Sequence, residues 1–211
     1  MSKPETIINY YVTCHRLKNT IRTGWKKWGV DAERLESIAE HVYGTQMLAL
    51  AIYSEYDYDV DILKVIFMLA IHEIGEAVIG DFTPFEIDKS EKERLEHEAV
   101  HKTLQDLKSN NEIEQYFLEF DARQTPEAKF AYQCDKIEAE LQCKIYDELG
   151  CIDIHNLPNN EVTSNSEIQK TLQICNSWSE AFINYDNHLV SYDDIFRAIS
   201  EHVKNNKITK N

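Results

Sequence analysis

Apolar residues recur at helical spacing along almost the whole chain, and few helix-breaking residues interrupt them. Only 6 glycines and 4 prolines occur in 211 positions, which favours long helices over many short strands. A chain of this length can bury the core of one domain and is short for two. We therefore expect an all-α fold, a single-domain helical bundle that covers residues 1–211.

Capping residues mark where several of these helices begin. Asp61 is the expected N-cap of the third helix, and Thr125 followed by Pro126 opens the fifth. Two capping-box patterns open the fourth and sixth helices, Ser90 with Glu93 and Ser164 with Glu167. The third helix is apolar on most sides, so we place it at the centre of the bundle. The helices are expected at about residues 4–20, 34–56, 61–79, 91–108, 126–149, 166–186 and 192–204.

The charge balance argues against one large class of function. The chain has 22 basic and 37 acidic residues, a net charge of −15, and such a surface repels the phosphates of DNA and RNA. A small phosphorylated substrate is still compatible with this charge if its pocket carries positive charge of its own, such as a metal ion. Trp25 and Trp28 are accordingly interpreted as core packing rather than as a platform for stacked bases.

The cysteines and the apolar runs indicate the compartment. Five cysteines are an odd number and include no Cys-x-x-Cys pair, which argues against a disulfide framework or a thiolate zinc site. The first residues contain no apolar stretch of the signal-peptide type. The longest apolar run, residues 65–71, is seven residues long, against the roughly 20 that span a bilayer. We expect a reduced, soluble, cytoplasmic protein with no nucleic-acid or membrane partner.

Ionisable residues interrupt the most apolar helix near its end. His72, Glu73 and Glu76 lie within an otherwise hydrophobic stretch, and burying them unpaired would cost several kcal/mol. A divalent cation is the usual means of holding carboxylates and imidazoles together. His72 and Glu76 are four residues apart, so in a continuous helix they share one face. The helix is expected to stop at Gly80, which puts the carboxylate of Asp81 at its C-terminal end.

Two residues elsewhere in the chain complete a candidate ligand set. His41 follows directly on a glutamate, and Asp135 interrupts the apolar stretch of the fifth helix. Any one of these residues alone is most simply a solvated or structural residue. Together with His72 and Glu73, however, they form the mixed imidazole and carboxylate set that binds divalent metals. The charged residues 91–101 are instead interpreted as a solvated, salt-bridged helix surface.

Four segments carry a resemblance to a known family. They are residues 17–25 with Arg22-Thr23-Gly24-Trp25, residues 36–41 with Glu40-His41, residues 72–84 with His72-Glu73 and Gly80-Asp81, and residues 125–136 with Asp135. The order of two histidines, an acid directly after the second, and a later aspartate resembles the HD-domain superfamily of metal-dependent phosphohydrolases. The four segments resemble its bacterial 5′-deoxynucleotidase-like branch, over about residues 15–149.

The resemblance implies a helical fold around one divalent ion, with Mn²⁺, Co²⁺, Zn²⁺ and Mg²⁺ as candidates. It implies metal binding by His41, His72, Glu73 and Asp135, catalysis by the carboxylates of Glu76 and Asp81, and phosphate binding by Arg22. Two positions depart from the family pattern. Glu73 stands where the family name calls for Asp, and Thr23 follows Arg22 where some members have Trp.

The resemblance also implies an activity, and two alternatives stay open beside it. The expected reaction is hydrolysis of a phosphomonoester, a 5′-(deoxy)nucleoside monophosphate, to nucleoside and phosphate, by a homodimer. Another phosphate ester or nucleotide is the first alternative, because HD domains share one metal site across many substrates. The second is a metal- or nucleotide-binding module without turnover. Glu76, Asp81 and Arg22 speak against that module, since a protein that only binds does not need all three.

Overall fold

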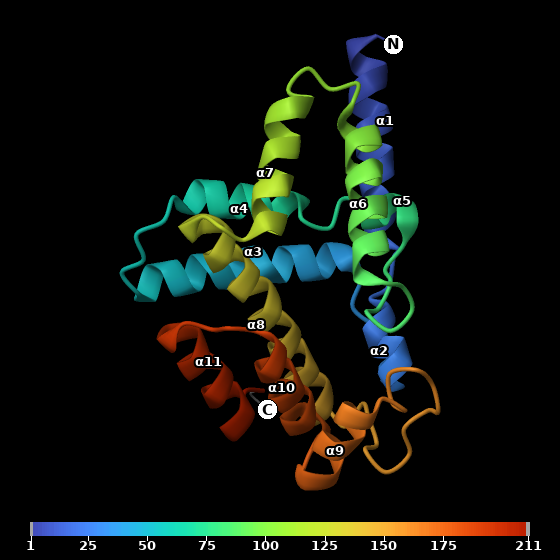
Figure 1. Cartoon of the computed structure of the whole chain (residues 1–211), viewed down its shortest axis with the longest axis vertical. Coiled ribbons are helices and arrows are strands. Elements are labelled where there is room, and N and C mark those ends of the chain that lie inside the picture. The colour runs from blue at the N-terminus through green and yellow to red at the C-terminus, as the bar shows by residue number, and fades with distance from the viewer. Residues whose placement is uncertain (1, 210–211) are drawn as a thin grey trace. The chain divides into compact units, whose positions relative to one another are not determined.

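The computed structural model describes residues 2–209, and helices make up its regular structure (Figure 1). This range contains no strand, and its one isolated bridge joins Ile21 and Ser37. The helices are α1 (Lys3–His15), η1 (Arg16–Lys18), α2 (Thr23–Trp28), α3 (Ile38–Glu55), α4 (Ile62–Ile71), α5 (Glu76–Ile79), α6 (Lys89–Leu104), α7 (Asn110–Ala122), α8 (Pro126–Glu148), α9 (Ser166–Ile174), α10 (Trp178–Leu189) and α11 (Asp194–Asn205). The predicted all-α class is therefore confirmed.

The chain divides into two compact units. Among the described residues, 2–22 and 36–134 form the first, which contains α1, η1, α3 to α7 and the start of α8. Residues 23–35 and 135–209 form the second, which contains α2, the rest of α8 and α9 to α11. The helical backbone of α8 is continuous through both. That the whole chain is one domain stays a prediction.

A capped, buried apolar helix organises the first unit. The carboxylate of Asp61 accepts two backbone N–H groups of the first turn of α4, which confirms it as the N-cap. Inside α4, Val65, Met68 and Leu69 are fully buried, and the helix packs against α3 and α7. Each such side chain stabilises the fold by about 1.5–3 kcal/mol through burial. The most apolar of the expected helices is thus a core helix.

A capping box opens α3 at Ser37. Its hydroxyl accepts the N–H of Glu40, and the Glu40 carboxylate accepts the N–H of Ser37. The isolated bridge between Ile21 and Ser37 holds the start of α3 against the residue before Arg22. The N–H of Arg22 also donates to the carbonyl oxygen of Glu36 at 3.0 Å. The arginine is thereby brought next to the N-terminus of the helix that carries His41.

The helix expected over residues 61–79 is interrupted, so that prediction is wrong. α4 ends at Ile71 and α5 begins at Glu76, with a run of turns between them. Nδ1 of His72 lies 2.8 Å from the carbonyl oxygen of Leu69, so a side chain takes the place of a helical backbone partner. The backbone bonds in these turns span three residues instead of four. His72 and Glu76 consequently do not share one face of a continuous helix.

Two other expected helices begin from a different capping residue than predicted. α6 starts from Asp88, whose carboxylate accepts the N–H of Ser90, so the predicted capping box at Ser90 is wrong. The helix expected over residues 166–186 is two helices, α9 and α10, and Asn165 rather than Ser164 caps the first. Asp88 lies two residues before the predicted Ser90 and Asn165 one residue after the predicted Ser164, so in each case a neighbouring side chain accepts the first N–H groups of the helix. α2 and α7 have no counterpart among the predicted helices.

Aromatic side chains form the core of the second unit. Trp25 and Trp28 of α2 are 3% and 6% exposed. Both pack edge-on against Trp178 of α10, with ring centroids 6.2 and 5.8 Å away. The interpretation of Trp25 and Trp28 as core packing is therefore confirmed.

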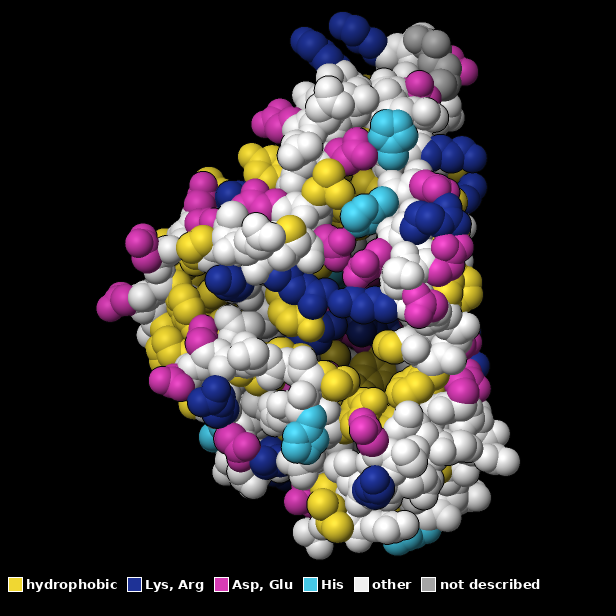
Figure 2. Space-filling model, viewed as in Figure 1, with side chains coloured by type: hydrophobic (Ala, Val, Ile, Leu, Met, Phe, Trp, Pro, Cys, Tyr) yellow, Lys and Arg dark blue, Asp and Glu magenta, His cyan; other side chains and the backbone are white. Residues whose placement is uncertain are grey.

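Charged side chains are scattered over the face of the molecule that Figure 2 draws. Figure 2 shows acidic groups spread over the face in view, in keeping with the net charge of −15. Among the described residues, no helix combines the length and the apolar character that crossing a membrane requires.

Candidate metal and catalytic site

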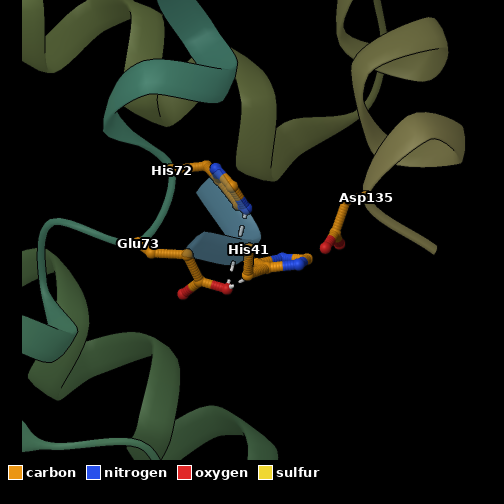
Figure 3. Close-up of side chains that lie close together, drawn as sticks. All are labelled: His41, His72, Glu73 and Asp135. Atoms are coloured by element: carbon orange, nitrogen blue, oxygen red, sulfur yellow. Dashed lines mark ion pairs between the residues drawn. The ribbon is translucent and has the colours of Figure 1, made fainter. Parts of the chain in front are cut away.

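Two histidines and a glutamate of the first unit meet between the start of α3 and the turn after α4 (Figure 3). His41 lies in the first turn of α3 and is fully buried. His72 follows α4 directly and is 8% exposed. The Oε1 atom of Glu73 lies 3.9 Å from Nε2 of His41 and 3.6 Å from Nε2 of His72. Both imidazoles thus approach one carboxylate oxygen.

The ring of His72 is oriented by the backbone. Its Nδ1 lies 2.8 Å from the Leu69 carbonyl oxygen, which can only accept, so Nδ1 carries the proton. In a neutral imidazole Nε2 then carries the lone pair and lies on the side of Glu73, the arrangement in which histidine binds a metal. The ring centroids of His41 and His72 are 5.5 Å apart, and Phe120 packs against His72 at 5.1 Å. Backbone and packing contacts therefore hold the imidazoles in place for a ligand.

Asp135 offers a fourth ligand atom. It follows Cys134 on α8 and is 6% exposed. Ligand atoms of His41, His72, Glu73 and Asp135 all lie within 4.8 Å of one another (Figure 3). Two imidazoles and two carboxylates suit a divalent cation that accepts nitrogen and oxygen ligands, and such an ion would offset the two negative charges. The residues present therefore fit a metal ion.

Glu76 is a buried carboxyl at the start of α5. It is 3% exposed, and its Oε1 accepts a hydrogen bond from Nζ of Lys92 at 3.2 Å, while Oε2 is buried without a hydrogen-bond partner among the described residues. Burial raises the pKa of Glu76 well above its ordinary value, and the charges of Glu73 and Asp81 raise it further. A raised pKa favours the protonated form of the carboxyl, which is the form that a general acid needs.

Asp81 and Arg22 lie within electrostatic reach of Glu76. Asp81 follows Gly80, which ends α5 with a φ of +83°, a conformation that glycine adopts without strain. The Asp81 charge raises the pKa of Glu76 and the Arg22 charge lowers it, so both groups lie near its carboxyl. Nε of Arg22 is 4.0 Å from Oε2 of Glu36, and the arginine side chain is 21% exposed. Within the first unit, the predicted phosphate-binding Arg22 and the predicted catalytic Asp81 therefore interact electrostatically with Glu76.

Residues 91–101 do not form a uniformly solvated surface, and that interpretation is wrong for two of them. The side chains of Lys92 and Glu96 are only 26% and 22% exposed, and they pair with each other at 3.3 Å. The signal lies in the spacing, because Lys92, Glu96 and the buried Ala99 are four and three residues apart and share one helical face. Sequence reasoning therefore missed a lysine beside Glu76.

Known proteins are similar to this chain over much of its length. The HD domain family model matches residues 14–204. The 5′-deoxynucleotidase hdd1 of Schizosaccharomyces pombe is 35% identical over 153 residues, which cover 69% of this chain and 75% of that protein. The 5′-deoxynucleotidase HDDC2 of Dictyostelium discoideum is 32% identical over 149 residues, which cover 67% of this chain and 77% of that protein. A predicted metal-dependent phosphohydrolase from Magnetospirillum magnetotacticum MS-1, known from its crystal structure, is 28% identical in sequence to this chain. The structural match has a TM-score of 0.57 and covers 68% of this chain and 71% of that protein.

Proposed function

The chain belongs to the HD-domain family, and from this membership we propose that it is a metal-dependent phosphohydrolase that releases phosphate from 5′-deoxynucleoside monophosphates. The membership confirms the resemblance predicted from the sequence motifs. The observation that carries the proposal is the cluster of two imidazoles and two carboxylates, with ligand atoms within 4.8 Å of one another, near the buried carboxyl of Glu76. Relatives named 5′-deoxynucleotidase, at 35% and 32% identity, support the substrate class.

Four side chains would hold one divalent cation, namely His41, His72, Glu73 and Asp135. Mn²⁺, Co²⁺, Zn²⁺ and Mg²⁺ are the candidates, because the ligand set mixes nitrogen and oxygen. When bound, such an ion supplies positive charge that polarises a phosphoryl oxygen and makes water more acidic. Glu73 reaches one methylene further than the aspartate of the family pattern, and its Oε1 still lies within 3.9 Å of both imidazoles.

Three further side chains would each have one role in the hydrolysis. The guanidinium of Arg22 binds two phosphate oxygens, which its planar fork allows and a lysine does not. The carboxylate of Asp81 orients the attacking water and takes its proton. The protonated carboxyl of Glu76 donates its proton to the 5′-oxygen as the bond between phosphorus and that oxygen breaks, a role that its raised pKa supports.

Phosphate release from a panel of nucleotides tests the proposal. The protein is incubated with dAMP, AMP, 3′-dAMP and dATP, with each of the four metals added separately. We expect metal-dependent release from dAMP, and its loss in Glu76→Gln with metal binding retained. Release from none of the monophosphates with any metal would refute the proposed function. Bound metal and nucleotide without product would indicate a binding module, and activity confined to dATP would indicate a triphosphate hydrolase.

We also propose that two copies of the chain pair through α1. Four apolar side chains lie within two turns of this helix and are 54–62% exposed, namely Ile7, Ile8, Tyr11 and Val12. Such a contiguous apolar patch is typical of a surface that another protein covers. Light scattering after size-exclusion chromatography tests this pairing, since Ile8→Glu should convert a dimer into a monomer. A monomeric wild-type protein would contradict it.

A further inference from the structure

A lysine of α6 lies between the buried carboxyl of Glu76 and a second carboxylate. Nζ of Lys92 is 3.2 Å from Oε1 of Glu76 and 3.3 Å from Oε1 of Glu96. Its side chain is 26% exposed, against 80% for Lys89 on the same helix. We propose that Lys92, held by Glu96, is a positioning residue that fixes the carboxyl of Glu76 for hydrolysis of the phosphate ester. This inference rests on the proposed function of the site.

The packing of α6 against the turn before α5 sets the position of Lys92 along its helix. A Cβ atom on Gly75 would lie 3.3 Å from the Glu96 carbonyl oxygen and 3.4 Å from its Cα, so the two backbones approach closely at this point. The backbone of Glu96 therefore packs against Gly75, the residue that precedes Glu76. Lys92 lies one helical turn earlier on the same face, and from there its side chain reaches the Glu76 carboxyl.

The hydrogen bond from Lys92 makes the two carboxyl oxygens of Glu76 inequivalent. Oε1 accepts the ammonium of Lys92, whereas Oε2 is buried and has no hydrogen-bond partner among the described residues. An ammonium can only donate, so the proton of a protonated Glu76 resides on Oε2. A carboxyl held at one oxygen also loses rotational freedom about its last bond, which keeps the other oxygen in one direction. In the proposed mechanism, Oε2 is therefore the oxygen that gives its proton to the leaving group.

Lys92 keeps its charge in this position. Burial acts against the charged form, but the carboxyl groups of Glu76, when ionised, and of Glu96 outweigh it, with smaller effects from Glu73 and Asp81, so the pKa of Lys92 lies above its ordinary value. The group that meets Glu76 is therefore an ammonium and not a neutral amine. A methionine at this position would fill similar space without the charge or the hydrogen bond.

Steady-state kinetics on dAMP test the role of Lys92. Lys92→Met should lower kcat about tenfold to a hundredfold, the usual effect of losing a hydrogen bond to a charged group, and change KM by less than about threefold. Lys92→Arg, which keeps the charge and the donors, should recover most of the lost kcat. Lys89→Met is the matched control, because it removes the same charge from an exposed position whose ion pair with Glu93 measures 3.6 Å. We expect it to leave kcat and KM unchanged.

A double variant separates positioning from stability. Removing Lys92 leaves the Glu96 carboxylate without its cation, so Lys92→Met should also lower the melting temperature. Adding Glu96→Gln removes that isolated charge and should restore stability. If Lys92 positions Glu76, kcat stays low in the double variant, because Glu96 acts only through the lysine. Recovery of kcat together with stability would overturn the inference.

A crystal structure of Lys92→Met gives a readout that does not depend on turnover. We expect the Glu76 carboxyl to be rotated or to occupy two conformers, while the backbone contact between Gly75 and Glu96 persists. An unmoved Glu76 carboxyl, or a kcat within about twofold of wild type, would overturn the role of Lys92. If the wild-type protein releases no phosphate from any nucleotide, the proposed function fails, and the structural comparison decides separately whether Lys92 positions Glu76.

Discussion

A buried carboxyl in the second unit makes the stability of the protein depend on pH. Glu140 lies on α8, is fully buried, and accepts a hydrogen bond from the hydroxyl of Tyr192 at 2.9 Å. Burial raises the pKa of Glu140 from 4.5 to about 8, although the hydroxyls of Ser200 and Tyr192 act in the opposite direction. At neutral pH the folded protein therefore holds a proton here that the unfolded chain has lost.

The raised pKa of Glu140 makes the free energy of unfolding fall as the pH rises. Below pH 4.5 the folded and unfolded states both bind the proton, so the carboxyl carries no penalty. Between pH 4.5 and about 8 only the folded state binds it, and the free energy of unfolding falls by about 1.4 kcal/mol for each pH unit. The loss reaches about 3 kcal/mol at pH 7 and about 5 kcal/mol above pH 8.

Glu140→Gln removes the titrating group and keeps an oxygen for the Tyr192 hydroxyl. Urea unfolding should show the variant to be more stable than wild type by about 1 kcal/mol at pH 5 and about 4 kcal/mol at pH 8. Glu148 on the same helix is the matched control, because hydrogen bonds from Thr209 and Ile208 lower its pKa to about 2 against the effect of its desolvation. Glu148→Gln should therefore lose stability at pH 7. A Glu140→Gln variant whose advantage does not grow between pH 5 and pH 8 would refute this reasoning.

Three further changes test the first unit. Glu76→Gln should lower kcat by at least about a hundredfold, the usual size of general acid catalysis, with metal binding by titration unchanged, and equal activity would remove Glu76 from the mechanism. Arg22→Lys should raise the KM for dAMP about tenfold, since lysine cannot hold two oxygens, and an unchanged KM would place the phosphate elsewhere. Gly75→Ala should lower the free energy of unfolding by about 1–3 kcal/mol, because the new methyl group meets the Glu96 carbonyl oxygen. Wild-type stability would show that the α6 backbone can shift by the few tenths of an ångström that the methyl group needs.

Features that depend on neighbouring residues can be predicted from this sequence. Asp61 and Thr125 accept backbone N–H groups of the helices that follow them, as their positions predict, because a cap needs only the next three residues. α8 runs from Pro126 to Glu148, within one residue of expectation. The metal-ligand set is not local, since His41, His72 and Asp135 lie far apart in the sequence, and it was predicted through the resemblance of their order to the HD-domain family. The structure brings ligand atoms of these residues and of Glu73 within 4.8 Å of one another.

Features that depend on contacts between elements cannot be predicted in this way. Lys92 and Glu76 are 16 residues apart and belong to different helices. Their ion pair exists because the α6 backbone at Glu96 lies against Gly75, a tertiary approach that no local pattern encodes. The end of α4 is a similar case, since a helix-forming apolar run gives no sign that the His72 ring will bind a carbonyl of the preceding turn.

The interruption between α4 and α5 separates two acids that a continuous helix would hold together. Glu73 and Glu76 are three residues apart, so in a helix their like charges would lie side by side on one face. In the structure, Glu73 meets Nε2 of His41 and of His72, whereas Glu76 meets Lys92. In the proposed mechanism one acid serves as a metal ligand and the other, more deeply buried, donates the proton. A chain that continued α4 unbroken through these positions would keep every one of these residues and still lack the site.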